Sequence, residues 1–178
     1  MARYAVFLRG INLGAMRRVR MEALRGALEG AGYDDVCTLV QSGNVVLTSD
    51  ADPAGLERDL VRTLREAFGF DIAVVARTRD ELADVIASDP FAGIADDPAR
   101  YQVSFLSAAP EPAAVEELEA AEEAPERVAV LGREVYAWHP GGVGRSELAK
   151  LITARRLGVE VTARNWRTVT KLLELADG

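Results

Sequence analysis

The chain has very few side chains suited to redox chemistry or metal binding, with one cysteine and one histidine in 178 residues. Cys37 has no partner for an intrachain disulfide bond, as is usual in a reducing compartment. Together with His139 it cannot supply the ligands of an ordinary zinc, copper or iron site. Carboxylates could hold magnesium beside substrate phosphates, but we expect no metal site and no cofactor.

Long apolar runs are also absent. No stretch approaches the ~20 apolar residues that a membrane-spanning helix needs. The first ten residues do not join a basic start to a long apolar run, so we expect no signal peptide. These absences predict a cytoplasmic protein that does not associate with membranes.

The chain has no overall excess of basic charge, because its net charge is −7, and this disfavours strong non-specific binding to nucleic acid. The basic residues are nevertheless concentrated near the two ends, in residues 1–25 and 145–171, while acidic residues gather between them, notably in 111–126. Two explanations stay open: solvated helix faces, or a surface that binds an anion.

Hydrophobic periodicity and turn signals predict a β-α-β-β-α-β order in the first part of the chain. Asp52 followed by Pro53 is typical of a helix N-cap with proline at the first helical position. Ser42-Gly43 is typical of a two-residue hairpin turn, and Cys37, in a β-rich run, is interpreted as a core residue. The expected strands are 4–8, 36–40, 45–48 and 72–75, and the expected helices are 21–28 and 53–68.

After the first part of the chain, Thr78 and Glu81 form a capping-box pair that opens a short helix. The β-α-β-β-α-β order then recurs in the second part. We therefore predict an α+β fold of two tandem ferredoxin-like (βαββαβ) subdomains with antiparallel sheets and a C-terminal helix. The later strands are expected at 101–106, 128–131, 135–138 and 160–162, with helices opened by Pro112, Ser146 and Asn165. The expected boundaries are 1–78 for the first subdomain, 79–100 for a helix and linker, and 101–178 for the second subdomain with the terminal helix.

Two candidate ligand-binding segments lie in the first subdomain. In residues 9–14, two glycines flank Asn12 directly after a strand, and backbone N–H groups together with Arg9 could hold an anion. Arg17, Arg18 and Arg20 follow closely, although a tight turn with positive φ would also explain the glycines. In the hairpin, the amides of Gln41 and Asn44 could bind a base edge or a peptide.

Two more candidates lie in the second subdomain. Glycines 141–144 run into a predicted helix start, where Arg145 and Ser146 could bind phosphate, or Ser146 could be an ordinary cap. Residues 164–171 combine basic side chains with Trp166, which could stack on a base or pack inward against Val169 and Leu173. His139 could be a general base, but a single histidine in a loop is more often incidental.

The sequence does not identify a catalytic residue. The predicted ligand-binding residues are Arg9, Gly10, Asn12, Gly14, Gln41, Ser42, Asn44, Gly144, Arg145, Ser146, Arg164, Asn165, Trp166, Arg167 and Lys171.

Three segments together resemble the bacterial DUF1697 family: YAVFLRGINLG at 4–14, QSGNVV at 41–46 and TARNWRTVTKL at 162–172. The resemblance covers essentially the whole chain. It implies a cytoplasmic α+β protein with two ferredoxin-like subdomains, and it implies no reaction, because the family has no established activity. Family members often have lysine after the serine that follows the glycine-rich loop. Here that position is Glu147, which predicts a less cationic pocket.

Our leading hypothesis is a binding module for an anionic ligand: a nucleotide, a phosphate-bearing metabolite or a nucleic-acid end. The ligand would lie in a basic cleft formed by residues 9–14, 41–44 and 164–171. One alternative is an enzyme acting on a phosphate-bearing small molecule, with His139 or Asp50 as base. Another is a protein-interaction domain that pairs through an exposed sheet edge. The sequence does not predict the oligomeric state.

Overall fold

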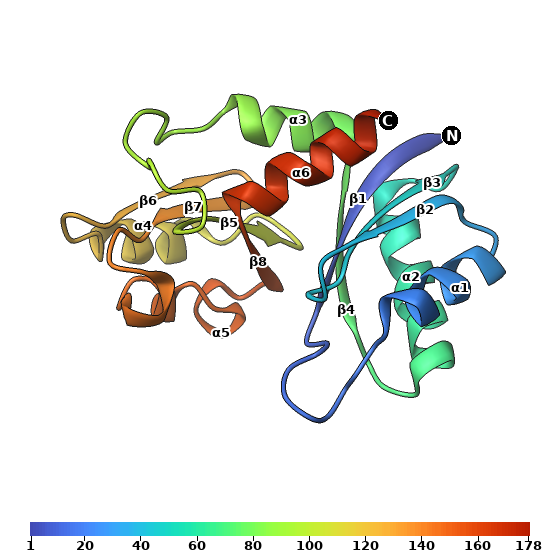
Figure 1. Ribbon diagram of the computed structural model, residues 1–178. Helices are drawn as coiled ribbons and strands as arrows, with labels where there is room; N and C mark the ends of the chain where they lie inside the picture. The colour runs from blue at the N-terminus through green and yellow to red at the C-terminus, as the bar shows by residue number, and fades with distance from the viewer. The chain divides into compact units, whose positions relative to one another are not determined.

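The computed structural model describes residues 1–178. Its fold is mixed α+β, with two four-stranded antiparallel sheets and six α-helices (Figure 1). None of the helices is both long enough and apolar enough to cross a membrane. The chain divides into two compact units: unit 1 is Met1–Asp84 with Lys171–Gly178, and unit 2 is Val85–Thr170. The sequence-based boundaries at 78 and 100 stay a prediction.

Unit 1 has the β-α-β-β-α-β order that its sequence predicts. The strand order in its sheet is β2-β3-β1-β4, and β1 pairs antiparallel with both β3 and β4. Helices α1 and α2 lie on one face of this sheet (Figure 1). The elements are β1 (Ala2–Arg9), α1 (Met21–Gly30), β2 (Asp34–Leu39), β3 (Asn44–Ser49), α2 (Pro53–Phe68) and β4 (Ala73–Thr78).

The core of unit 1 follows from alternation along β1 and helical spacing in α1 and α2. The residues that these three elements contribute to the core are Tyr4, Val6, Leu8, Leu24, Leu28, Leu56, Leu60 and Leu64. Ala5 and Phe7, on the other face of β1, are also buried. The start of α2 is as predicted, because the Asp52 side chain accepts a hydrogen bond from the Gly55 N–H at 2.8 Å and Pro53 is the first helical residue. Cys37, by contrast, is exposed on the edge strand β2, so its prediction as a core residue is wrong.

The turn between β2 and β3 is longer than predicted. Leu39 pairs with Asn44, which leaves a four-residue loop, 40–43, instead of a two-residue turn. Gly43 has a φ of +83°, and a Cβ there would lie 2.6 Å from Ile11 Cδ1 and 2.9 Å from Leu8 Cβ. The loop therefore packs closely against the end of β1, which only glycine permits at this position.

Helix α3 (Arg79–Ala87) follows β4, and the predicted capping box is present at its start. The Thr78 N–H donates to Glu81 Oε2 at 2.8 Å, and the Glu81 N–H donates to Thr78 Oγ1 at 3.1 Å. These reciprocal bonds satisfy two backbone donors that the first turn of a helix leaves without partners.

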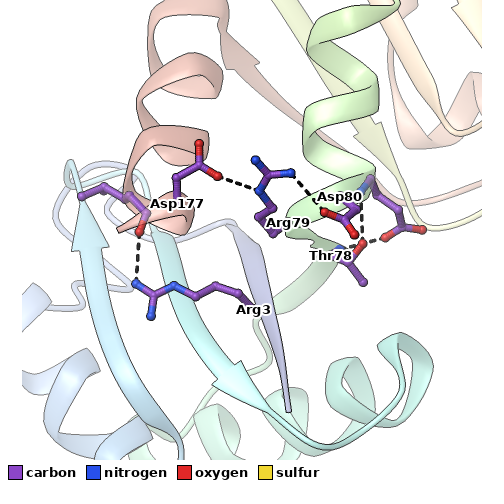
Figure 2. A network of polar contacts seen from close by, with 7 residues as sticks. Arg3, Thr78, Arg79, Asp80 and Asp177 are labelled. Carbon is purple, nitrogen blue, oxygen red and sulfur yellow. Dashed lines mark hydrogen bonds and ion pairs between the residues drawn. The ribbon is translucent and has the colours of Figure 1, made fainter.

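The last turns of α6 (Trp166–Asp177) belong to unit 1, where two arginines hold them (Figure 2). Arg3 Nη2 donates to the backbone oxygen of Leu175 at 3.1 Å. Arg79 Nε donates to Asp177 Oδ1 at 2.6 Å, and Arg79 Nη1 lies 3.1 Å from Asp80 Oδ1. The C-terminal residues are thus attached both to β1 and to the start of α3.

Unit 2 also contains a four-stranded antiparallel sheet, with strand order β6-β7-β5-β8. Its buried core includes Leu106, Leu118, Val135 and Leu157. Pro112 is the first residue of α4, as predicted. The elements are β5 (Tyr101–Leu106), α4 (Pro112–Ala120), β6 (Arg127–Leu131), β7 (Glu134–Trp138), α5 (Ala154–Leu157) and β8 (Val161–Asn165).

The predicted helix opened by Ser146 is wrong. This region contains two short 3₁₀ turns, Val143–Arg145 and Ala149–Leu151, and then the four-residue α5. The backbone leaves helical geometry at Ile152, where ψ is 77°, and Thr153 is extended. The Thr153 side chain then caps α5 by accepting from the Arg156 N–H. A helix running past residue 152 would lose this cap, and β-branched residues gain little from helical geometry.

Candidate functional site

Two of the predicted segments meet in unit 1 around one surface hollow of about 310 Å³. We call it the Asn12 hollow. Its lining residues are Asn12, Gly14, Arg18, Val19, Arg20 and Gln41. The hollow therefore lies between the loop after β1 and the tip of the β2–β3 hairpin.

Asn12 holds these two loops together. Its side-chain Nδ2 donates to the backbone oxygen of Val19 at 3.0 Å and to that of Gln41 at 2.7 Å. Its Oδ1 accepts from the Val19 N–H at 2.9 Å. Asn12 has a φ of 55°, a left-handed conformation that asparagine tolerates better than most residues. Its amide is therefore engaged in shaping the hollow, which makes Asn12 a positioning residue.

Arg18 and Arg20 give the Asn12 hollow its positive charge. Both are exposed, and neither guanidinium has a hydrogen-bond or ion-pair partner in the structure. Arg17 differs, because its guanidinium carbon lies 5.6 Å from the centre of the Phe70 ring, in a cation–π arrangement. Arg9, at the end of β1, does not line the hollow.

Every second residue of this loop has a positive φ, since Gly10, Asn12 and Gly14 have φ values of 79°, 55° and 72°. Residues with positive φ are common in loops where backbone N–H groups turn toward one side and can face an anion. The Asn12 N–H is not available, because it donates to the backbone oxygen of Arg17 at 3.0 Å.

On the hairpin side, Gln41 is exposed and lines the hollow, whereas Asn44 is fully buried. Asn44 Nδ2 donates to the Leu39 backbone oxygen at 2.9 Å and to Ser42 Oγ at 3.1 Å. The Asn44 amide thus stabilises the hairpin. Asn12, Gly14 and Gln41 are the predicted residues that line the hollow, while Gly10, Ser42 and Asn44 do not line it.

Arg18 and Arg20 are missing from the predicted ligand-binding residues. Their closeness in sequence to the glycine loop is the signal that could have included them.

In unit 2, Arg164 is only 8% exposed. Its Nη1 donates to Thr162 Oγ1 and to the Ala163 backbone oxygen, both at 2.8 Å. Burial lowers the pKa of the Arg164 guanidinium to about 10, so it remains protonated at neutral pH. Asn165 is the N-cap of α6 as predicted, because its Oδ1 accepts from the Thr168 N–H at 2.9 Å.

Trp166 packs against the protein through one ring face. Its ring stacks on Tyr101 with centroids 4.8 Å apart and planes 22° apart. The Tyr101 hydroxyl donates to Asp89 Oδ1 at 2.6 Å. The pKa of Tyr101 is raised, mainly by burial and also by this hydrogen bond. The face of Trp166 in contact with Tyr101 is closed to a base. Of the remaining basic residues, Arg167 is exposed and Lys171 Nζ lies 2.6 Å from Glu174 Oε2.

The predicted cleft would combine residues of unit 1 with residues 164–167 of unit 2. This arrangement stays a prediction.

The glycine-rich loop of unit 2 borders a pocket of about 170 Å³, which we call the Glu126 pocket. Its lining residues are Pro125, Glu126, Pro140, Gly141, Gly142, Arg145 and Ser146. Gly144 is not among them. Ser146 Oγ accepts from the Ala149 N–H at 2.9 Å, so it caps a single turn. The premise of a phosphate site at an α-helix N-terminus therefore does not hold here.

Glu126 is the residue of this pocket that sequence analysis did not identify. Burial by itself would raise the pKa of Glu126. Hydrogen bonds from Ser146, from His139 and from the Leu148 backbone N–H lower it by a larger amount, so the pKa of Glu126 lies below its usual value. Glu126 is therefore ionised at neutral pH. Nothing in its sequence context distinguishes it from the other acidic residues of 111–126.

His139 is fully buried, and its Nδ1 lies 3.1 Å from Glu126 Oε1. Its Nε2 is buried without a hydrogen-bond partner. Serine, glutamate and histidine are thus close together, but the carboxylate lies between the hydroxyl and the imidazole. A serine nucleophile requires the imidazole in the middle to accept its proton, so this cluster does not activate Ser146.

The second base considered from sequence, Asp50, is exposed and pairs with the amine of Met1 at 2.8 Å. Neither His139 nor Asp50 lines the Asn12 hollow or the Glu126 pocket. No three or more histidine, cysteine, aspartate or glutamate side chains come together in a group that could hold a metal ion.

Comparisons with known proteins give the fold from a solved structure and the family from a sequence profile. The chain is similar to a solved structure of the conserved bacterial protein SP0830 from Streptococcus pneumoniae, with a TM-score of 0.76 and 23% sequence identity over 98% of both chains. At that identity the likeness shows the fold alone. No functionally curated protein matches the chain. The sequence profile described as "Protein of unknown function (DUF1697)" matches residues 1–136, and the chain therefore belongs to the DUF1697 family.

Proposed function

We propose that this protein is a binding module for a phosphate-bearing anionic ligand, which the Asn12 hollow holds through Arg18 and Arg20. The observation that carries the proposal is the pair of guanidinium groups without partners on one hollow. A guanidinium can form two parallel hydrogen bonds with a phosphate, which makes arginine well suited to this role.

The shape of the site supports the same conclusion. The Asn12 amide bonds to Val19 within its own loop and to Gln41 of the hairpin, so the hollow exists before a ligand arrives. A preformed site binds more tightly because less conformational entropy is lost on binding. Exposed Gln41 adds an amide that can donate to a phosphate or contact the rest of the ligand.

The charge of the whole chain narrows the class of ligand. With a net charge of −7, the protein repels long polyanions at a distance, although the hollow itself is basic. A nucleotide, a phosphate-bearing metabolite or the end of a nucleic acid fits this combination better than an extended duplex.

Finer aspects of the fold are part of this proposal. In each unit the strand order places the first and third strands in the middle of an antiparallel sheet, which supports a ferredoxin-like interpretation of both subdomains. The proposed domains are residues 1–78 and 101–178, with 79–100 as helix and linker. The single cysteine, which has no partner for an intrachain disulfide bond, supports a cytoplasmic location.

The test measures binding of a fluorescent ATP analogue at low salt by anisotropy. The Arg18→Gln/Arg20→Gln double variant should bind at least about tenfold more weakly, a loss of about 1.4 kcal/mol. Arg58→Gln/Arg155→Gln is the matched control, because both arginines are exposed, have no ion-pair partner and lie outside the hollow. If both double variants lose affinity equally, the effect is one of net charge and the proposal fails.

A further inference from the structure

The Glu126 pocket combines two opposite charges. Glu126 and Arg145 both line it, and they do not form an ion pair with each other. Arg145 is exposed and has no acidic partner. Its guanidinium is therefore available to a ligand.

The Glu126 carboxylate is held in place from behind. His139 Nδ1 lies 3.1 Å from Oε1, and the Ser146 hydroxyl and the Leu148 backbone N–H supply further hydrogen bonds. Glu126 is 21% exposed and belongs to the pocket lining. Its negative charge is thus fixed in position and accessible from the pocket.

These charges exclude the simpler classes of ligand. A phosphate at Arg145 and Ser146 would face the negative charge of Glu126, and like charges in a partly desolvated site repel strongly. A plain cation on Glu126 would meet the same opposition from Arg145. A ligand that carries both charges satisfies both groups and leaves neither unpaired.

We propose that the Glu126 pocket binds a small zwitterion of the amino-acid class, with its ammonium group on Glu126 and its carboxylate on Arg145. The pocket volume of about 170 Å³ fits a compact ligand of this kind. The glycines support the assignment, because a Cβ at Gly141 or Gly142 would meet no atom within 4 Å, so this part of the lining stays open.

The test is a titration followed by amide chemical shifts of Gly141, Gly142 and Arg145. Glycine and L-alanine are the zwitterionic probes, and acetate and methylamine are the matched half-probes with one charge each. Both amino acids should shift these amides saturably, and each half-probe should need at least about tenfold higher concentration.

Variants complete the experiment. Arg145→Gln should weaken glycine binding at least about tenfold and leave methylamine binding no weaker, whereas Arg145→Lys should restore part of the affinity for glycine. Arg155→Gln, an exposed arginine outside the pocket, is the control. Glu126→Gln should abolish the preference for glycine over acetate, and its dispersed amide spectrum would show that it still folds.

The proposal is overturned if neither amino acid shifts these amides, if acetate binds as well as glycine, or if Arg145→Gln binds glycine unchanged. The outcome is independent of the anion site in unit 1, because the Arg18→Gln/Arg20→Gln variant leaves the Glu126 pocket intact.

Discussion

Single polar side chains that form hydrogen bonds with other segments shape both candidate sites. Asn12 forms three hydrogen bonds, two with Val19 in its own loop and one with Gln41 in the hairpin, and Glu126 connects the start of β6 to the segment that contains His139 and Ser146. Removing one partner of such a bond leaves a polar group without a partner, which costs more than the net gain from forming the bond. The two residues therefore support predictions about both stability and binding.

Replacing Asn12 should loosen the hollow. Asn12→Ala removes the clamp and also puts a residue that tolerates left-handed backbone less well than asparagine at a φ of 55°, so we expect a loss of about 2–4 kcal/mol in the free energy of unfolding. Asn12→Gly tolerates that φ and loses only the clamp, so it should lose less stability but a similar amount of affinity for the ATP analogue. Urea unfolding and anisotropy measure the two effects, and wild-type affinity in Asn12→Gly would show that the clamp does not shape the site.

Glu126 predicts a dependence of stability on pH. Its pKa is lower in the folded protein than in the unfolded chain, so its contribution to stability is fully present above the ordinary pKa of a glutamate. The contribution is lost as the pH falls through the folded pKa, because the carboxyl group must then be protonated. The difference in urea midpoint between the wild-type protein and Glu126→Gln should therefore be largest near neutral pH and shrink in acid. A difference that does not change with pH would show that the charge of Glu126 adds no stability.

At the scale of secondary-structure elements, glutamates cover one edge of each sheet. On the edge strand β4, the Ala76 N–H donates to Glu57 Oε1 at 2.7 Å. On the edge strand β6, the Val128 N–H donates to Glu122 Oε2 at 2.8 Å and the Val130 N–H donates to Glu119 Oε1 at 3.3 Å. Backbone donors on an exposed edge would otherwise be free to pair with another chain. These contacts disfavour self-association through β4 and β6.

Uncovering one edge should therefore promote association. In Glu119→Ala/Glu122→Ala, the Val128 and Val130 N–H groups lose their acceptors. We expect a dimer whose fraction, measured by sedimentation velocity, increases with protein concentration. Glu116→Ala/Glu123→Ala is the control, because it removes the same charge from exposed glutamates that have no side-chain partner. Equal association of both variants would attribute the effect to reduced charge repulsion.

At the scale of the whole molecule, charge is distributed so that a small basic hollow lies on an acidic protein. The negative field of the whole protein repels an anionic ligand at a distance, whereas the basic hollow attracts it at close range.

The chain crosses between the two compact units within two helices, because the division falls within α3 and within α6. The end of α6 is held in unit 1 by Arg3 and Arg79 (Figure 2).

The opposition between the negative field and the basic hollow predicts a preference for short anions. ATP should compete fully with its fluorescent analogue, whereas a DNA duplex should compete no better per molecule than a mononucleotide, because only its end can approach the hollow closely. Competition anisotropy at low salt measures both. A duplex that competes much more strongly, with a steep loss of affinity as salt is added, would indicate an extended nucleic-acid surface instead.

Local features of this protein were predictable from sequence because they depend on residues only a few positions apart. The Asp52 cap, the Thr78–Glu81 capping box and the Asn165 cap all involve contacts within one helical turn. The strand order along the chain follows from the same kind of short-range pattern. The predicted helix after Ser146 is absent, because the chain leaves helical geometry at Ile152 and Thr153 caps the separate helix α5.

The sites themselves were decided by the tertiary structure. Asn12 and Gln41 are 29 positions apart, and Glu126 and His139 are 13 apart, so their contacts arise only when strands pair and loops pack against them. Sequence by itself determined the fold class, the family and the glycine and arginine segments worth inspecting. Only the folded chain selected Arg18 and Arg20 as partnerless cations on a hollow and placed Glu126 beside Arg145, because burial and charge pairing depend on neighbours in space.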